Sequence, residues 1–293
     1  MTVVGVRGGL SVDHLVHVGA GARFDELGGP GLFGALGARL VAGTQIRLYA
    51  RLPDDEPRFA KLFHELGFTT SASAREPHAM RLWILNSQQG RRIVTTSSIG
   101  PIELESATES VDDADDVPVT GDIDGLLDSS PLERPVVAET VRVGTDPHQV
   151  PLQTEGLDYL HRVSPPRALV LPSRVQLGLI DPDPLAAARG IQARLGLDVI
   201  ARLDRDGMVV MTSDGEWTVR DPAVQVVETT GAGDSSAGAI VAAWAAGADL
   251  ATAAAYGVSV ARLALSGWGH ECLLTEPLTE PFPDVTITRK RQL

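Results

Sequence analysis

The 293-residue sequence predicts an α/β fold in which helices flank both faces of a central, mostly parallel sheet. Two observations carry this prediction. Apolar runs of strand length alternate with longer helical patterns, and the last two helical patterns are apolar on most of their faces, as in helices packed under a sheet. A hydrophobic content of 43% is enough for one large core. We therefore predict a single domain over residues 1–293 with a small, reduced β lid.

The predicted elements follow one another in the order expected for such a sheet. The first half reads as strand, helix, strand and helix over residues 2–6, 32–41, 46–50 and 58–66. The second half contains strands at 168–171 and 199–203 around a helix at 184–195, a hairpin at 207–212 and 216–219, and helices at 234–246 and 250–265.

Some segments fall outside this repeat. Residues 14–18, 81–85 and 92–95 are further strand-like runs, so we expect the lid to come from segments 13–27 and 81–96. Residues 103–128 are acidic and short of aromatic side chains, which predicts a mobile or loosely packed surface segment.

Composition excludes several classes of partner. A net charge of -13 disfavours nucleic acid, because affinity for phosphate backbones comes mainly from clustered Lys and Arg. The longest apolar stretch, residues 237–255, is interrupted by Asp249 and fits buried helices better than a membrane span. The single cysteine, Cys272, rules out an internal disulfide framework and suits a reducing compartment. We expect a cytoplasmic monomer or homodimer.

The most informative stretch leads from Val226 through Gly231, Ala232 and Gly233 to Asp234. A strand ends, the glycines form a turn without side-chain bulk, and a helix begins with free backbone N–H groups. Such a place binds anions and stabilises charge that develops during transfer of a group. An Asp at a helix start is ordinarily an N-cap. The preceding Thr-Thr-Gly-Ala-Gly favours instead a base beside an anion site.

The stretch Glu228-Thr-Thr-Gly-Ala-Gly-Asp234 resembles the C-terminal motif of the ribokinase-like (PfkB-type) carbohydrate and nucleoside kinases, where Asp-Thr-Thr-Gly-Ala-Gly-Asp is usual. The resemblance implies that Asp234 takes the proton from a substrate hydroxyl. It also implies that the backbone of Gly231, Ala232 and Gly233 stabilises the transferred phosphoryl group. ATP, Mg²⁺ and a small polyhydroxylated substrate are the ligands that follow from it.

The N-terminal half carries the rest of the resemblance. Gly9-Leu-Ser-Val-Asp13 is similar to the family's first strand, whose terminal Asp holds substrate hydroxyls, and Gly28-Gly29 is similar to its paired-glycine motif. Phe33 stands where the family usually has Asn, so it is either a core residue or an apolar wall of the substrate site. Arg81, on a lid strand, is a further candidate for substrate contact. Each of these residues has an alternative that stays open. Asp13 could be a strand-end residue that faces solvent, the glycine pair could form an ordinary turn, and Arg81 could simply pack on its strand.

The nucleotide site departs from the family. Ser173-Arg-Val-Gln176 corresponds to the family's Asn-x-x-Glu, which organises Mg²⁺ and phosphate, and Arg202-Leu-Asp-Arg-Asp-Gly207 corresponds to Thr-Leu-Gly-x-x-Gly. Arg174 is either a phosphate contact or a solvated side chain. Glu228 is either part of a loop that binds a monovalent cation such as K⁺ or a solvated strand-end acid. The predicted ATP-binding residues are Ser173, Arg202, Asp204, Gly207, Thr230 and Gly257.

Together these observations predict an ATP-dependent phosphotransferase acting on a hydroxyl of a small sugar, cyclitol or nucleoside. Departures at Ser173, Gln176, Phe33 and Asp204 keep an alternative open, a ligand-binding or regulatory protein of the same fold with little kinase activity. A third reading is a structural subunit without a ligand. The seven histidines show no spacing typical of a zinc site, so no protein metal site is expected.

Overall fold

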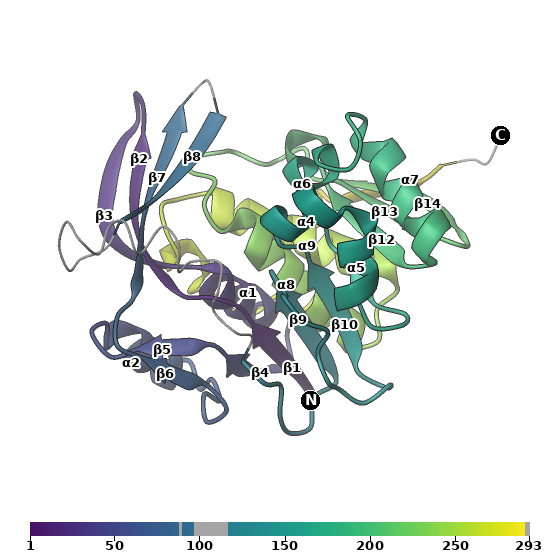
Figure 1. Cartoon of the computed structure of the whole chain (residues 1–293). Helices are drawn as coiled ribbons and strands as arrows, with labels where there is room; N and C mark the ends of the chain where they lie inside the picture. Colours follow the sequence, from purple (N-terminus) through teal and green to yellow (C-terminus); the bar gives the residue numbers. More distant parts are fainter. Residues whose placement is uncertain (88–89, 97–116, 291–293) are drawn as a thin grey trace.

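A large sheet forms the middle layer of the computed structural model, which describes residues 1–87, 90–96 and 117–290 (Figure 1). Among these residues nine strands lie in the order β15-β14-β13-β12-β11-β10-β9-β1-β4. Neighbours from β4 to β12 pair in parallel, and β13, β14 and β15 add an antiparallel edge. The strands are β1 Thr2–Arg7, β4 Thr44–Tyr49, β9 Gly125–Ser129, β10 Arg142–Asp146, β11 Leu169–Val170, β12 Asp198–Arg202, β13 Met208–Thr212, β14 Gly215–Arg220 and β15 Thr286–Arg289.

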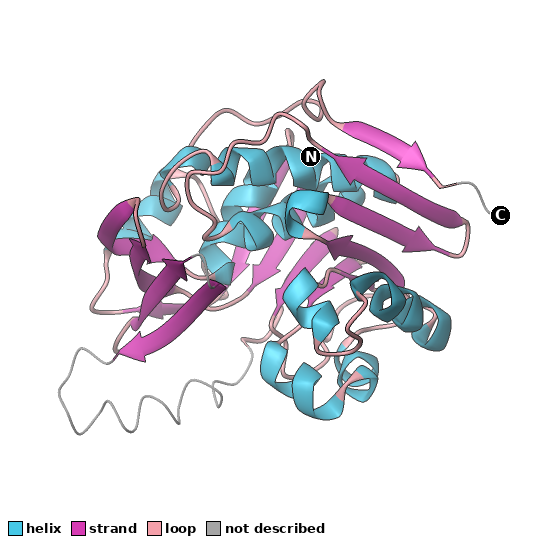
Figure 2. Cartoon of the chain, turned by 90° about the horizontal axis from the view of Figure 1, so that it is seen from above, coloured by secondary structure: helices cyan, strands magenta, loops and turns pink. Residues whose placement is uncertain are grey.

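Helices cover both faces of this sheet, so the predicted fold class is confirmed (Figure 2). On one face lie α1 (Pro30–Arg39), α8 (Ala232–Ala245) and α9 (Leu250–Leu265), and on the other α4 (Gln149–Glu155), α5 (Leu157–Val163), α6 (Arg174–Gly178) and α7 (Pro184–Leu195). Within β12 the side chains alternate between the two cores. Ile200 packs on the α8 side, while Val199 and Ala201 pack on the α7 side. Both faces of a parallel sheet are therefore buried, as expected when crossover helices surround it.

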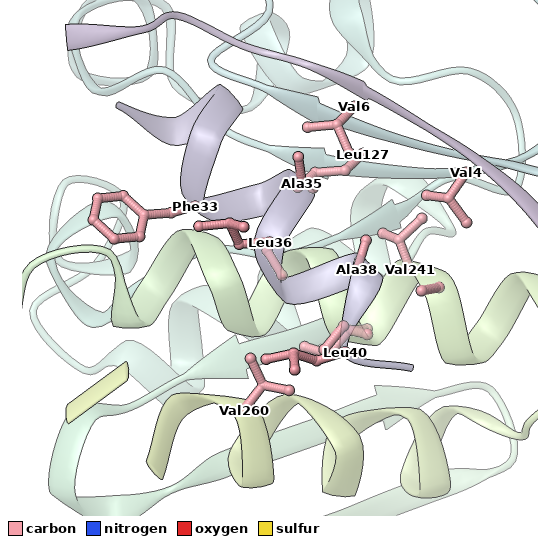
Figure 3. Close-up of a cluster of buried hydrophobic side chains, with 14 of the residues drawn as sticks. Val4, Val6, Phe33, Ala35, Leu36, Ala38, Leu40, Leu127, Val241 and Val260 are labelled. Carbon is pink, nitrogen blue, oxygen red and sulfur yellow. The ribbon is translucent and has the colours of Figure 1, made fainter. Parts of the chain in front are cut away.

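The core around α1 explains where the first turn of α8 lies. Figure 3 shows α1 between Val4, Val6 and Leu127 of the sheet and Val260 of α9. Glycines let α1 and α8 approach closely. A Cβ atom at Gly37 would lie 1.9 Å from the backbone oxygen of Ser235, and one at Gly238 would lie 2.0 Å from that of Gly34. The N-terminal end of α8 is thus fixed against α1 by backbone contact.

A second, four-stranded sheet projects from the main body (Figure 1). It has the order β3-β2-β7-β8, with strands β2 Ser11–His17, β3 Gly21–Gly28, β7 Met80–Ser87 and β8 Gly90–Thr96. We call this sheet the lid, because its strands contain most of the two segments that the sequence analysis assigned to a lid. Near its base are α2 (Arg58–Glu65) and a small sheet of β5 (Arg51–Pro53) and β6 (Ala74–Glu76). Short 3-10 turns occur at Asp204–Asp206 and Glu271–Leu273.

Two sequence-based expectations need correction. The run from Gly9 to Asp13 is not part of the first strand: β1 ends at Arg7, and Asp13 lies within the second strand, in the lid. The predicted loose segment at 103–128 is wrong at its C-terminal end. Residues 125–128 belong to β9, which is fully buried next to β1, because a central strand can carry an Asp when that side chain is paired. Residues 103–116 lie outside the described part.

Candidate active site

The predicted site residues gather at the carboxyl ends of the parallel strands. The strand order reverses between β1 and β9, because β4 lies on one side of β1 and the later parallel strands lie on the other. Open α/β sheets bind ligands in the crevice at such a switch point. Buried charged residues end the strands here: Arg7 on β1, Asp128 on β9, Asp146 on β10 and Arg202 on β12.

The turn at Gly231–Gly233, where α8 begins, has the backbone conformation of an anion-binding site, and we call it the anion turn. Gly231 is the N-cap residue of α8 with φ 77°, a left-handed conformation that favours glycine. A Cβ atom here would also lie 2.2 Å from the Phe33 ring. The Phe33 side chain is buried against this turn, which supports the core alternative for that residue. The first N–H groups of a helix have no acceptor within it, although the Ala232 amide makes a long 3.4 Å bond to the Thr229 carbonyl.

Asp234 is the third residue of α8 and does not cap it, because the N-cap is Gly231 and no side chain caps this helix. Burial raises the pKa of the Asp234 carboxyl, and the nearby charge of Asp146 raises it further. The positive charges of Arg202 and Arg91 act in the opposite direction. Asp249 starts the next helix and shows the contrast: it caps α9 by accepting from the Thr252 amide, a bond that lowers its pKa. Two aspartates at similar sequence positions are therefore in opposite environments.

Asp13 reaches the same site from the lid. It is buried, and its carboxylate accepts a 2.7 Å hydrogen bond from the Ser11 hydroxyl. Burial raises the pKa of Asp13 to about 6, against the hydrogen bond from Ser11 and the charge of Arg91, while the negative charges of Asp234 and Glu228 raise it further. Two carboxylates from the C-terminal half of the chain thus act on the Asp13 carboxyl of the lid.

The paired glycines make room for Asp13. A Cβ atom at Gly28 would lie 2.0 Å from Oδ2 of Asp13, and Gly29, the N-cap residue of α1, has φ 94°. Both positions demand glycine, one for space and one for backbone conformation.

We expect Gly28→Ala to raise the KM for the acceptor roughly tenfold or more, because the methyl group displaces the Asp13 carboxylate, which the resemblance predicts to hold substrate hydroxyls. The KM for ATP should change little. Gly9→Ala is the matched control, since a Cβ atom at Gly9 meets nothing within 4 Å. Steady-state kinetics with both substrates varied measure the two constants, and equal increases in both would contradict the assignment of Gly28 to the acceptor side.

A buried ion pair supports the first turn of α8. Arg202 donates from Nη1 to the Gly233 carbonyl at 2.5 Å and from Nη2 to Oδ1 of Asp146 at 2.6 Å. The same Oδ1 accepts a 3.2 Å bond from Gln176. Gln176 also forms a capping box with Ser173 at the start of α6. The chain therefore has a fixed guanidinium beside the anion turn, and an amide where the family usually has the Glu of Asn-x-x-Glu.

Glu228 is buried rather than solvated, so that reading of the sequence is wrong. The residue is only 1% exposed, and its carboxylate accepts hydrogen bonds from the amide and from the hydroxyl of Thr230. The lid contributes a further donor: Nδ2 of Asn86 lies 3.0 Å from Oε1 of Glu228. Glu228 is thereby hydrogen-bonded both to Thr230, in the turn before α8, and to Asn86 of the lid.

The remaining predicted nucleotide residues lie around this centre. Asp204 adopts φ 51°, which explains why glycine is usual there, and a Cβ atom at Gly207 would lie 2.3 Å from the Val219 carbonyl oxygen. Gly257 packs against Ile240 of α8, which accounts for the glycine without a nucleotide. Arg174 pairs with Asp204 at 3.0 Å and also with Asp206. Their roles toward ATP stay predictions.

The lid residue Arg81 does not share a face with Asp13. Leu82 is the register partner of Asp13, and Arg81 precedes it, so the alternation of a strand directs Arg81 to the opposite face. There Arg81 lies 3.6 Å from Asp25. This geometry supports the strand-packing alternative for Arg81 over substrate contact.

Sequence analysis missed Asp146, Asn86 and Arg91. Asp146 had a usable signal, because it ends a short apolar run as Asp13 was thought to do. Asn86 and Arg91 carry no such signal in the sequence. They come close to each other and to the site only through the pairing of β7 with β8.

Mg²⁺ bound with ATP fits this donor set in part. Mg²⁺ needs few protein ligands and keeps several waters, and Asp146 is a carboxylate at the right edge of the sheet. One oxygen of Asp146 is already engaged by Arg202 and Gln176. No cluster of three or more His, Cys, Asp or Glu side chains among the described residues could hold a metal ion by itself. In the same residues, no helix is long and apolar enough to cross a membrane.

Comparison with solved structures identifies the fold. The nucleoside kinase of Methanocaldococcus jannaschii, an archaeal member of the ribokinase family, superposes with a TM-score of 0.69 over 95% of this chain and 96% of its own, at 15% identity. The ribokinase of Cryptococcus neoformans, solved with ADP, gives 0.69 over 95% and 98% at 17% identity. This chain has the ribokinase fold. A fructokinase variant of Vibrio cholerae, solved with fructose, ADP and potassium, shares this fold with a TM-score of 0.68 over 93% and 95%, at 15% identity.

Comparisons of sequence point to the same group of kinases. Residues 181–271 match the model of the pfkB family carbohydrate kinases. An uncharacterized sugar kinase of Archaeoglobus fulgidus is 28% identical over 110 residues, 37% of this chain and 44% of its own length. The uncharacterized sugar kinase YegV of Escherichia coli is 36% identical over 84 residues, 29% of this chain and 26% of its own. The chain thus matches less than half the length of these relatives. With the ribokinase fold, it resembles the ribokinase-like (PfkB-type) carbohydrate and nucleoside kinases.

Proposed function

We propose that this protein is an ATP-dependent phosphotransferase that phosphorylates a hydroxyl of a small sugar, cyclitol or nucleoside. One observation carries the proposal: a half-buried Asp234 with a raised pKa lies in the first turn of α8, beside the Gly231–Gly233 backbone and within electrostatic reach of Asp13. The single cysteine suits a cytoplasmic enzyme, and the net charge of -13 disfavours nucleic acid as a partner.

In this proposal each group has one task. Asp13 accepts hydrogen bonds from two substrate hydroxyls and thereby orients the acceptor. Asp234 takes the proton of the reacting hydroxyl as its oxygen attacks the γ-phosphorus of ATP, and the bond from that phosphorus to the bridging oxygen breaks, so that ADP leaves. The amides of Gly231 and Gly233 and the guanidinium of Arg202 bind the charge that gathers on the transferred group. Mg²⁺, when bound with ATP, neutralises phosphate charge, and Asp146 is the carboxylate placed to orient it.

A substrate panel tests the proposal. ADP release by the purified protein with Mg-ATP is measured against sugars, cyclitols and nucleosides, and turnover that depends on one class of acceptor is the expected result. Thermal unfolding with the same compounds runs alongside. If ligands raise the melting temperature by mass action while none is phosphorylated, the protein is a binding or regulatory protein of this fold.

The pH dependence of the reaction should report the raised pKa values. Asp13 must be ionised to accept hydroxyls and Asp234 to accept a proton, so kcat/KM should rise with pH through about 6, the pKa of Asp13, and through the raised pKa of Asp234. A pH–rate profile measures this. Asp13→Asn should remove the part of the acid-side rise of kcat/KM that comes from acceptor binding. If that rise is unchanged in Asp13→Asn, a group other than Asp13 causes it.

Stability should change in the opposite sense. Because the native state holds the Asp13 proton more tightly than the unfolded chain, the free energy of unfolding should fall as pH rises from about 3.8 to about 6. For Asp13 alone the loss is roughly 3 kcal/mol. Chemical denaturation at several pH values measures it, and Asp13→Asn should remove this part of the slope.

A further inference from the structure

The Glu228 carboxylate joins two parts of the site, the turn before α8 and the lid. It is buried, and Thr230 donates to it from its amide at 2.9 and 3.0 Å and from its hydroxyl at 2.8 Å. Thr230 immediately precedes Gly231, where the backbone turns into α8. The position of this carboxylate therefore determines the position of the turn whose amides the proposed reaction uses.

Asn86 brings the lid into this junction. Its amide nitrogen donates to Oε1 of Glu228 at 3.0 Å, although the two residues are 142 positions apart. Asn86 is also the only asparagine in the chain. On β7 it lies four residues after Leu82, the register partner of Asp13, so both side chains are on the lid face that covers the site. Lid and anion turn thus share one hydrogen-bonded carboxylate.

We propose that Asn86 is a positioning residue for the anion-binding turn, and that its amide holds Glu228 in the place where a monovalent cation would otherwise act. The proposal rests on the proposed function only in giving that turn a catalytic role. With Asn86 in place, the contact of the lid with Glu228 orders the turn, and K⁺ is not required.

The donor set at Glu228 argues against a cation site. Oε1 already accepts from the Thr230 amide, the Thr230 hydroxyl and Asn86, and Oε2 accepts from the Thr230 amide. Three donors therefore share the roughly two lone-pair sites of Oε1, so a cation that bound Oε1 would have to displace a protein donor. Glu in place of the family's usual Asp adds one methylene, which extends the carboxylate toward the lid. The Glu228 carboxylate, with these donors, therefore does not fit the role of a ligand in a monovalent-cation loop.

Hydrogen exchange of the ligand-free protein tests the contact without any assay of activity. Removing one donor to a buried carboxylate weakens its hold on Thr230, so Asn86→Ala should speed exchange at the Thr230 amide roughly tenfold or more. Leu85→Ala is the matched control, because Leu85 is the neighbouring residue on the same strand, is exposed and points to the other face. Equal exchange at Thr230 in the two variants would overturn the proposal.

Potassium titration supplies the second readout. Exchange at Thr230 and ADP release by the wild type should be the same in potassium chloride and in choline chloride. In Asn86→Ala, potassium should restore part of the lost protection and part of kcat, since a cation can then occupy the vacated side of Glu228, while the KM for the acceptor stays near its wild-type value. Strong potassium dependence of the wild type would overturn the proposal.

The two readouts separate this inference from the proposed function. If no acceptor is phosphorylated but Thr230 exchange responds to Asn86→Ala as expected, the contact stands and the kinase assignment fails. If turnover is found and Asn86→Ala changes neither exchange nor kcat, the kinase stands and the inference fails.

Discussion

Asp234→Asn is expected to lower turnover by roughly 10³-fold while leaving the protein at least as stable as the wild type. The rate falls because the amide cannot accept the hydroxyl proton. Stability is kept because burial and the charge of Asp146 already disfavour the ionised Asp234, as its raised pKa indicates. At a pH above that pKa, an isosteric neutral side chain removes an unfavourable charge from the native state. ADP release and thermal unfolding measure the two effects.

Asp249→Asn provides a matched comparison. It changes the same residue type at the start of the neighbouring helix, but Asp249 accepts from Thr252 and has a lowered pKa. This variant should lose stability, by about 1 kcal/mol or less because Asn also caps helices well, and keep its turnover. A large loss of stability in Asp234→Asn, with turnover reduced only in proportion, would show that Asp234 has a structural role alone.

The fold was predictable because its signals are local. Residues 184–195 were predicted as a helix with the bounds that α7 has, since Asp183 caps one end and Gly196, in the left-handed conformation, ends the other. The β13–β14 hairpin was predictable from alternation around Ser213 and Asp214. The predicted loose segment failed at β9 because Asp128 reads as a surface residue, and only its pairing with Arg7 at 2.6 Å makes burial acceptable.

The site was predictable only where a motif names its residues. The turn at Gly231–Gly233 and Asp234 follows from one short stretch, and Gly28 follows from a glycine pair. The partners of these residues come from elsewhere. Glu228 was misread because one of the donors that make its burial acceptable, Asn86, lies on a lid strand 142 residues away. Asp146 was missed because its partner Arg202 belongs to a different strand. Long-range polar pairing leaves no periodic pattern in a sequence.

Arg202 is the second residue whose loss should have a large effect. Its side chain is 8% exposed and joins Asp146 to the Gly233 carbonyl, so it both neutralises a buried carboxylate and fixes the first turn of α8. Arg202→Gln leaves Asp146 with only the amide of Gln176. Breaking a buried ion pair by removing one partner costs about 3–5 kcal/mol, so the free energy of unfolding should fall by that order. Turnover should fall roughly 10²-fold or more, as when one stabiliser of developing charge is lost.

A double variant separates the two effects of Arg202. In Arg202→Gln with Asp146→Asn no buried charge is left unpaired, so most of the lost stability should return. Turnover should not return, because the guanidinium beside the anion turn is still absent. Chemical denaturation and ADP release, measured on both single variants and the double variant, complete the cycle. If the double variant recovers turnover together with stability, Arg202 only supports the fold. If stability alone recovers, and Asp146→Asn by itself lowers turnover less than the double variant does, the positive charge acts on the transferred phosphoryl group. This chain has then placed a fixed cation where the family's Thr-Leu-Gly turn has a neutral side chain.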